Sequence, residues 1–339
     1  MRIGIDGRKI DDFGIGTHIR GLLGGLAELG GEDQYVVLAP ARARSAIPAA
    51  FEHVVADVPH YSVRELIFFG RSVDAARLDL FHAPHYVVPF LSTPYVVTVH
   101  DLIHLRDPRP LARLYARGMM GRVVRRGRRV MTVSESVRRE IVSTFGVREE
   151  AVVVTPNAAA AVFVTEGPRA SGRYFLYVGN DKPHKNVELM VEAFEQARRG
   201  DVQLVMVGAP FERYRQRTAV LLPGYVRETE LAALYRGALA VVVPSREEGF
   251  GLPALEAMAC GAPVITSTAA ALVEITGEAA LHAAPTVDGL RQAMTRVLED
   301  GALRRELSER GPRRASAFGW RATATIARDV YRAALSATR

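Results

Sequence analysis

The sequence predicts an α/β protein with two domains, each built around a parallel sheet. Short β-branched runs such as Val241–Val243 and Val264–Thr266 are typical of buried parallel strands, and a helical segment separates these two runs. A length of 339 residues suits two domains of ordinary size. The stretch 158–172 is rich in Ala, Gly, Pro and Ser, which indicates an interdomain linker. We therefore expect a first domain over residues 1–165 and a second over 166–318.

The first domain is expected to contain a series of short strands and one glycine-rich turn. Gly14 and Gly16 precede a segment with apolar residues at helical spacing, so they could form a turn that approaches phosphate. The third glycine of a dinucleotide fingerprint is missing, and Ile19 stands in its place, so a purely structural turn fits equally well. The expected strands are Arg2–Asp6, Tyr35–Leu38, a short one within Leu80–His85, Tyr95–Asp101, Met131–Ser134 and Val152–Asn157.

Histidine and aspartate stand at the ends of two of these strands. His100 and Asp101 follow the run Tyr95–Val99, and His82 and His85 belong to the strand before it. Because residues at the carboxyl ends of parallel strands face the ligand crevice, His100 is a candidate site residue. Asp101 could also face the ligand, or it could orient His100 or cap the next turn. The histidines lack the spacing of a metal site, so no metal is expected.

The second domain opens with an apolar strand and a lysine-containing loop. Tyr174–Gly179 is the strand, and the loop from Asn180 leads into a helix expected from Val187. Lys185 stands near the start of that helix, where the helix dipole disfavours a cation. A bound diphosphate would reverse this penalty, so Lys185 is a candidate anion ligand. Further strands are expected at Val202–Val207, Val241–Val243 and Val264–Thr266, with helical structure from Leu281 onward.

The segment Val241–Thr266 carries the most informative motif of the chain. The turn Glu248–Gly251 precedes a short helix with Pro253 as its expected first residue, and the N–H groups of the last two turn residues would bind an anion such as phosphate. Glu248 and Glu256 flank this turn. Carboxylates repel phosphate but accept strong hydrogen bonds from sugar hydroxyls. A ligand with phosphate between two sets of hydroxyls is a nucleotide-sugar; the alternative is that both glutamates are merely solvated.

This motif closely resembles the donor-site signature of retaining glycosyltransferases with the GT-B architecture, and in particular the family GT4. The hallmark of that family is two glutamates separated by seven residues, and Glu248 and Glu256 match this spacing. The resemblance implies two Rossmann-like domains that face a cleft, with residues 319–339 crossing back to the first domain as a terminal helix. It also implies that Glu248 contacts the donor sugar, Glu256 the ribose and Lys185 the diphosphate.

The resemblance extends to residues outside the motif. The family often has an arginine several residues before the lysine; Asn180 stands there in this chain, and Lys182 could replace it. The catalytic residues that the resemblance implies are His100, Lys185 and Glu248. Those expected on the acceptor side are His82, His85 and Asp101. Those expected to bind the donor are Gly14, Gly16, Asn180, Lys182, Lys185, Val226, Glu248, Gly249, Phe250, Gly251, Leu252 and Glu256.

These expectations describe a retaining hexosyltransferase with a nucleotide-sugar donor. Similarity to mannosyl-type members favours GDP-mannose first and a UDP-sugar second, with a glycan or lipid-linked acceptor. The chain has no Asp-x-Asp triplet, so neither a metal bridging the diphosphate nor another cofactor is expected. The alternatives are a nucleotide-sugar epimerase of the same fold and a non-catalytic nucleotide-sugar-binding protein. A nicotinamide-dependent oxidoreductase is disfavoured by the broken glycine pattern.

Positive charge is concentrated in one segment. Residues 106–129 contain nine arginines and one aspartate, a local excess of eight positive charges. A helix is expected over Pro110–Val130, with an apolar face that includes Leu111, Leu114 and Met119. Such a helix is either a solvated charged face or a site that binds an anionic membrane surface. Nucleic acid is disfavoured because the arginines are not interleaved with aromatic residues and no binding motif accompanies them.

The remaining composition excludes several classes of protein. A single cysteine, Cys260, excludes a disulfide framework and a cysteine-rich metal site. The sequence shows neither a signal peptide nor an apolar run near 18 residues, so we expect a cytoplasmic protein, with peripheral association at the inner membrane face as the alternative that the basic segment suggests.

Overall fold

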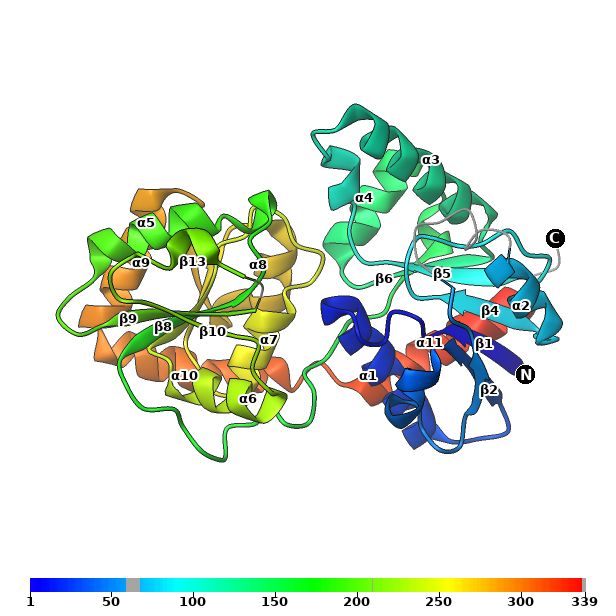
Figure 1. Ribbon diagram of the computed structural model, residues 1–339, viewed down its shortest axis with the longest axis horizontal. Helices are drawn as coiled ribbons and strands as arrows, with labels where there is room; N and C mark the ends of the chain where they lie inside the picture. The colour runs from blue at the N-terminus through cyan, green and yellow to red at the C-terminus, as the bar shows by residue number, and fades with distance from the viewer. Residues whose placement is uncertain (59–67, 209, 337–339) are drawn as a thin grey trace. The chain divides into compact units, whose positions relative to one another are not determined.

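The computed structural model describes residues 1–58, 68–208 and 210–336 (Figure 1). The chain divides into two compact units. Unit 1 comprises Met1–Asn157 and Gly319–Arg339, and unit 2 comprises Ala158–Phe318. The first boundary therefore lies at Asn157 rather than at residue 165, because the linker residues pack on unit 2.

Unit 1 is built on a parallel seven-stranded sheet in the order β3-β2-β1-β4-β5-β6-β7. The strand order reverses between β1 and β4, and crevices for ligands form at such reversals. The strands are β1 (Arg2–Asp6), β2 (Gln34–Ala39), β3 (Glu52–Val55), β4 (Leu80–Ala83), β5 (Tyr95–Val99), β6 (Arg129–Thr132) and β7 (Val152–Val154). The helices are α1 (Phe13–Leu29), α2 (Gly70–Ala75), α3 (Pro110–Arg126), α4 (Glu135–Phe145) and α11 (Trp320–Ser336).

Both faces of this sheet are buried, which explains the near-continuous apolar runs of its strands. Val37 of β2 belongs to an apolar cluster shared with α1 and α11. Its neighbours Val36 and Leu38 belong to a second cluster, shared with α3 and α4. Successive residues of a strand point to opposite faces, so one strand supplies both cores. Helices α1 and α11 pack side by side (Figure 1). The ring of Trp320 lies against Gly21.

Unit 2 repeats this plan with a parallel six-stranded sheet in the order β10-β9-β8-β11-β12-β13, which reverses between β8 and β11. The strands are β8 (Tyr174–Gly179), β9 (Gln203–Gly208), β10 (Val220–Gly224), β11 (Ala240–Val243), β12 (Val264–Ser267) and β13 (Leu281–Ala283). The helices are α5 (Val187–Ala197), α6 (Glu228–Gly237), α7 (Leu252–Ala259), α8 (Ala270–Thr276), α9 (Val287–Glu299) and α10 (Gly301–Ala315).

Three sequence-based expectations about these elements were wrong. Leu281–Ala283 is an edge strand paired with β12, and three residues are too few to show an alternating pattern. Helix α3 ends at Arg126, because Arg129 already pairs with β5 as the start of β6. Gly14 and Gly16 do not precede a helix but form the first turn of α1. By contrast, Ser134 caps α4 as its residue type predicts, with its hydroxyl accepting from the Val137 N–H.

Candidate functional site

The predicted donor-binding residues of unit 2 gather at the point where its strand order reverses. One loop, residues 180–186, leaves the carboxyl end of β8, and the other, residues 244–251, leaves the neighbouring strand β11. In an open parallel sheet the loops on either side of such a reversal diverge to opposite faces and leave room for a ligand between them. The sheet topology therefore provides a site at this position before any side chain is considered.

Polar contacts join these two loops. Asn186 is buried, adopts the left-handed conformation at φ 54°, and donates its side-chain amide to the Pro244 carbonyl at 3.0 Å. Asparagine tolerates this conformation better than most residues, which fits its place between the loop and α5. The Arg246 N–H donates to the His184 carbonyl at 2.8 Å. These hydrogen bonds therefore hold the two loops in one arrangement relative to each other.

Lys185 and Glu248 form a direct ion pair between the loops. The Lys185 ammonium lies 2.7 Å from Oε1 of Glu248, and their side chains are 19% and 11% exposed. The Ser245 hydroxyl donates to the same Oε1 at 2.8 Å. An ammonium has three donors and a carboxylate has two oxygens, so each partner keeps capacity for a ligand. Lys185 can still donate to an anion, while Oε2 of Glu248 can accept from a hydroxyl.

The start of helix α7 is held in place by two tight contacts. Gly251 immediately precedes the helix at φ 93°, and a Cβ at this position would lie 2.5 Å from Cδ2 of Leu272, so only glycine fits. The buried Phe250 ring packs edge-to-face on Phe318 at 5.7 Å between centroids. Leu252 begins the helix, and Pro253 is its second residue rather than its first. Pro253 has no N–H, and the Ala254 N–H donates to the Gly251 carbonyl at 3.0 Å. The N–H groups of Gly251 and Leu252 precede the helical hydrogen-bond pattern and can donate to an anion.

The other predicted donor residues lie in the same loops or beside them. Asn180 directly follows β8, and its Oδ1 accepts from the N–H of the exposed Lys182 at 3.2 Å. Val226 is half-buried after β10. Glu256 lies in α7 and is buried, with its carboxylate accepting the Tyr235 hydroxyl at 2.9 Å. Tyr235 thus contacts a predicted donor residue, and the sequence analysis did not single it out because nothing in its local pattern separates it from an apolar core position.

In unit 1 the predicted residue His100 directly follows β5. Its Nε2 lies 2.9 Å from the Pro84 carbonyl, and because a carbonyl can only accept, this nitrogen carries the proton. Nδ1 therefore holds the lone pair and can accept a hydrogen bond from a ligand hydroxyl. Burial lowers the pKa of His100 to about 4, so the ring is neutral at pH 7.

A second imidazole, His18, packs on His100 and was also missed. The two rings meet edge-to-face at 4.8 Å between centroids, and Nδ1 of His18 lies 2.7 Å from Oδ1 of Asn157. Among the described residues, the buried Nε2 of His18 has no hydrogen-bond partner. Burial, and then the neighbouring His100, lower the pKa of His18 to about 3. The sequence contained one signal for this residue: His18 lies one helical turn from Ile15 and Leu22, on the apolar face of α1, which indicates a buried imidazole.

His82 and His85, both predicted on the acceptor side, make hydrogen bonds within unit 1. His82 is fully buried, and its two ring nitrogens lie 2.8 Å from the Tyr331 and Thr98 hydroxyls. His85 is buried as well, with Nε2 at 3.2 Å from the Asp6 carboxylate. His82 thus ties β4 to β5 and α11, and His85 ties the loop after β4 to the end of β1. Their acceptor-side role stays a prediction.

Asp6 anchors a buried ionic group at the reversal point of the unit 1 sheet. The Arg8 guanidinium donates to both carboxylate oxygens of Asp6, at 2.9 and 2.7 Å. Burial by itself raises the pKa of this carboxyl, but the Arg8 charge and the His85 hydrogen bond outweigh it and hold the pKa well below its usual value. Neither Asp6 nor Arg8 was identified from the sequence, because a strand-end Asp followed by Arg is common.

Asp101 and the two glycines of α1 have local structural roles. Oδ1 of Asp101 accepts from the Ile103 N–H at 3.0 Å, which caps the following turn and agrees with one of the two alternatives left open for it. Gly16 is buried where a Cβ would lie 2.4 Å from the Ile10 carbonyl oxygen, so packing accounts for its lack of a side chain. Gly14 is exposed in the same turn.

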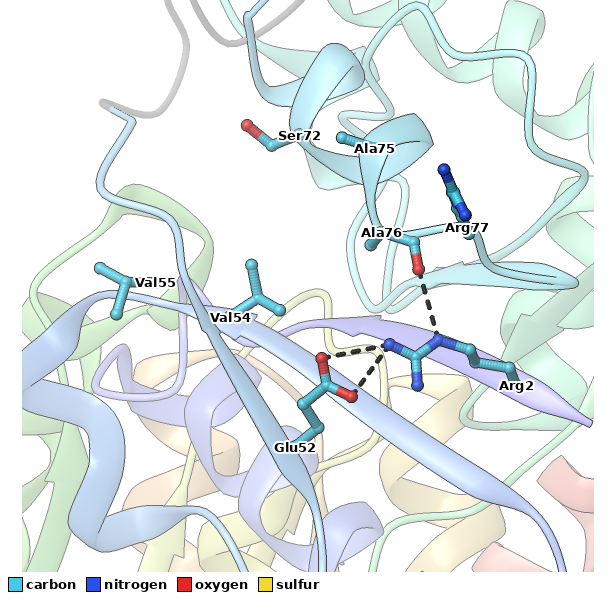
Figure 2. Close-up of a pocket in the computed structure, with 8 residues that line it drawn as sticks. All are labelled: Arg2, Glu52, Val54, Val55, Ser72, Ala75, Ala76 and Arg77. Carbon is cyan, nitrogen blue, oxygen red and sulfur yellow. Dashed lines mark hydrogen bonds and ion pairs between the residues drawn. The ribbon is translucent and has the colours of Figure 1, made fainter.

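A separate pocket of about 790 Å³ lies at the opposite edge of the unit 1 sheet. It is lined by Arg2 at the start of β1, Glu52 at the start of β3, and residues around α2. Figure 2 shows the Arg2 guanidinium directed at Glu52, to which it donates at 2.9 and 3.1 Å, and at the Ala76 carbonyl. This pocket is at the amino ends of the strands, whereas the candidate residues follow the carboxyl ends.

Comparison with known proteins places both units in one family. The family model Glycosyltransferase Family 4 matches residues 14–160, and the model Glycosyl transferases group 1 matches residues 163–314. The chain is 28% identical over 281 residues to the O-antigen chain mannosyltransferase B of Escherichia coli, which covers 75% of this chain and 74% of that protein. It is 31% identical over 287 residues to the glycogen synthase of Mycobacterium tuberculosis, covering 76% and 69% respectively.

Solved structures share the fold. The Anabaena protein HepE, in complex with UDP and glucose, superposes with a TM-score of 0.79 at 17% identity, over 98% of this chain and 99% of that one. The similarity covers both parallel-sheet units.

Acidification should destabilise unit 1 through its buried histidines. An unfolded histidine has a pKa near 6.5, whereas His18 and His100 have pKa values of about 3 and 4 in the fold. Below about pH 6.5 the unfolded state therefore binds more protons, and the unfolding free energy should fall by roughly 1.4 kcal/mol per pH unit for each histidine until pH approaches 4. Urea unfolding at several pH values, followed by fluorescence of the single tryptophan Trp320, measures this in unit 1.

Two variants show whether this pH dependence arises from the buried rings. His100→Gln should reduce the slope between pH 6.5 and 4.5, whereas His104→Gln, at an exposed imidazole, should leave it unchanged. A stability that stays flat between pH 6.5 and 5 in the unmodified protein would contradict the prediction.

Proposed function

We propose that this chain transfers mannose from GDP-mannose to a glycan or lipid-linked acceptor. The chain belongs to the glycosyltransferases that the Glycosyltransferase Family 4 and Glycosyl transferases group 1 models describe, and it is a hexosyltransferase of the GT-B type. A UDP-hexose is the second candidate donor. The observation that carries this proposal is the arrangement at the reversal point of the unit 2 sheet. There the Lys185 ammonium pairs with the Glu248 carboxylate, and the loop that carries Glu248 leads into the start of α7. These groups supply donors for a diphosphate and an acceptor for a sugar hydroxyl.

The main chemical problem in this reaction is the charge that develops on the departing diphosphate. Lys185 and the N–H groups of Gly251 and Leu252 at the start of α7 would stabilise that charge as preorganised donors. Glu248, fixed by Lys185 and Ser245, would accept a hydroxyl of the hexose. With these cationic and dipolar groups supplied by the protein, we propose that transfer does not depend on a metal ion.

His100 would contribute on the unit 1 side as a neutral acceptor. Its Nε2 proton is committed to Pro84, so Nδ1 is oriented as a lone pair. A neutral ring accepts from a sugar hydroxyl and does not add positive charge beside the anomeric centre. Transfer would proceed with retention, and we assign no covalent nucleophile.

The choice of donor rests on the relatives. The relative from Escherichia coli is named a mannosyltransferase, which favours GDP-mannose. The structure of HepE contains UDP and glucose, which keeps a UDP-hexose as the second choice.

A panel of nucleotide-sugars tests the proposal directly. The protein is incubated without acceptor with GDP-mannose, UDP-glucose and UDP-N-acetylglucosamine, and products are separated by chromatography. Slow hydrolysis of GDP-mannose, unaffected by excess chelator, is expected. An isomerised sugar would indicate an epimerase, binding without turnover would indicate a nucleotide-sugar-binding protein, and loss of hydrolysis in chelator would overturn metal independence.

Lys185→Ala should lower the turnover number by a factor of roughly one hundred or more, the scale for losing one preorganised donor at a developing charge. Steady-state kinetics on the preferred donor measure this. Lys182→Ala is assayed in parallel, since this exposed lysine belongs to the same loop. If Lys185→Ala raises only KM, the lysine binds ground and transition states equally. If Lys182→Ala instead causes the larger loss of turnover, Lys182 is the lysine that stabilises the charge developing on the diphosphate.

Helix α3 supports association with an anionic membrane surface. Leu111 and Leu114 are 83% and 68% exposed, whereas Met120 and Val123 of the same helix are buried in the unit 1 core. The apolar face expected from the sequence is therefore divided in two. The carboxyl-terminal part is buried in the unit 1 core, and the amino-terminal part is exposed. Exposed arginines such as Arg113 surround it. Exposed leucines among arginines are typical of helices that lie in a membrane interface.

Unit 1 would dock on a membrane through this end of α3 and bring a lipid-linked acceptor to the site. Among the described residues, no helix is both long and apolar enough to cross a bilayer. Each arginine near an anionic leaflet contributes about 1 kcal/mol, within a Debye length.

Replacing Arg113 and Arg117 with glutamine should weaken binding to phosphatidylserine-containing vesicles by about 2 kcal/mol, or roughly thirtyfold, at low salt. Co-sedimentation measures the bound fraction, which high salt should lower for the unmodified protein. The matched control replaces two exposed arginines of α10, Arg305 and Arg313, and should bind normally. If the unmodified protein ignores these vesicles at low salt, α3 is only a solvated surface and the acceptor is water-soluble.

A further inference from the structure

The carboxylate of Glu256 is held by a hydroxyl from a neighbouring helix. Glu256 of α7 is 8% exposed, and its Oε2 accepts the Tyr235 hydroxyl of α6 at 2.9 Å. Tyr235 is fully buried, so this hydroxyl cannot exchange its partner for bulk water. A buried carboxylate is expensive to leave without donors, and the tyrosine supplies one.

The ring of Tyr235 is itself fixed. Phe163 packs edge-to-face on it at 5.6 Å between centroids. Phe163 belongs to the linker segment, and the same segment is tied to α6 by the Ala170 N–H, which donates to the Ala233 carbonyl at 2.9 Å. The hydroxyl therefore approaches Glu256 from one direction only.

We propose that Tyr235 is a positioning residue that occupies Oε2 of Glu256 and so presents Oε1 to the ribose hydroxyls of a bound nucleoside diphosphate. This inference rests on the proposed function, in which Glu256 is the ribose ligand. Tyr235 would not touch the ligand. It acts by fixing the orientation of the Glu256 carboxylate. Ligand binding then does not have to restrict the rotation of that side chain.

The chemistry of the pair fits this role. Burial, and then the adjacent Glu256 carboxylate, raise the pKa of Tyr235 well above its usual value, so the hydroxyl keeps its proton and remains a donor. Phenylalanine would fill nearly the same volume but would leave Oε2 without this donor. Tyr235→Phe therefore isolates the hydrogen bond from the packing of the ring.

The experiment compares each ribonucleotide with the form that lacks the ribose hydroxyls. Affinities of GDP, UDP and their 2′,3′-dideoxy counterparts are measured by calorimetry, and the ratio of the two dissociation constants reports the contribution of the hydroxyls. In the unmodified protein this ratio should be roughly tenfold or more for the preferred base, the scale of a charged hydrogen bond. Glu256→Gln should largely abolish it, and Tyr235→Phe should reduce it by roughly threefold or more.

Tyr174→Phe is the matched control. It removes another tyrosine hydroxyl that donates to α6, at 2.8 Å to the Leu234 carbonyl, and it leaves Glu256 untouched, so its ratio should equal that of the unmodified protein. Phe163→Leu keeps the Tyr235 hydroxyl but removes the ring contact, and it should reduce the ratio to a smaller extent. This second variant keeps the test decisive if Tyr235→Phe does not fold.

The outcomes separate the inference from the function on which it rests. If Glu256→Gln abolishes the ratio while Tyr235→Phe and Phe163→Leu leave it unchanged, the positioning role is wrong and the ribose assignment stands. If the unmodified protein binds ribo and dideoxy forms equally, the ribose role of Glu256 fails, and the positioning role with it. If it binds neither GDP nor UDP, the proposed function itself fails.

Discussion

The constraint on which this structure depends is that all strands of each sheet run parallel. Parallel strands require crossover connections, and in this chain the crossovers go to both faces of each sheet, so the strand order reverses once in each unit. The reversal separates two loops at the carboxyl edge, and in unit 2 the candidate residues stand in those loops. His100 follows β5 in unit 1, and Lys185 and Glu248 follow β8 and β11 in unit 2. Residues far apart in sequence thus become neighbours through backbone topology.

The charges in these loops are arranged in self-neutralising groups. Lys185 pairs with Glu248, and Asp6 pairs with Arg8, both with little exposure to solvent. Such pairs contribute little net stability compared with an apolar core, but removal of one partner leaves a buried charge alone. At the proposed donor site the pair also has a chemical consequence, because one partner suits hydroxyl groups and the other suits phosphate. Each can accept its part of a ligand without the pair having to separate.

The sequence predicts the strands of this fold well and its buried polar contacts poorly. The bounds of β1 and β8 follow directly from apolar runs, because both faces of these strands are covered. The edge strands β3, β10 and β13 were not predicted, and the three residues of β13 are too few to show a period. Glu248, Glu256 and Lys185 were chosen as candidates by spacing and electrostatics. His18 and Tyr235 were not, because their significance lies in partners such as Asn157 and Glu256, which only the tertiary structure brings near. For the same reason the sequence did not show that His82 and His85 contact Tyr331, Thr98 and Asp6.

The composition of unit 1 from two separated parts has a consequence for biosynthesis. Helix α11 closes over α1 and contributes Ala324, Ala327 and Tyr331 to the same apolar cluster, yet the whole of unit 2 lies between these helices in the chain. A ribosome therefore delivers the strands of unit 1 well before the helix that covers one of their faces. Unit 2 is continuous and can complete its core first. During that interval the uncovered surface of α1 remains exposed to chaperones or to other nascent chains, and truncation before Trp320 would leave it open permanently.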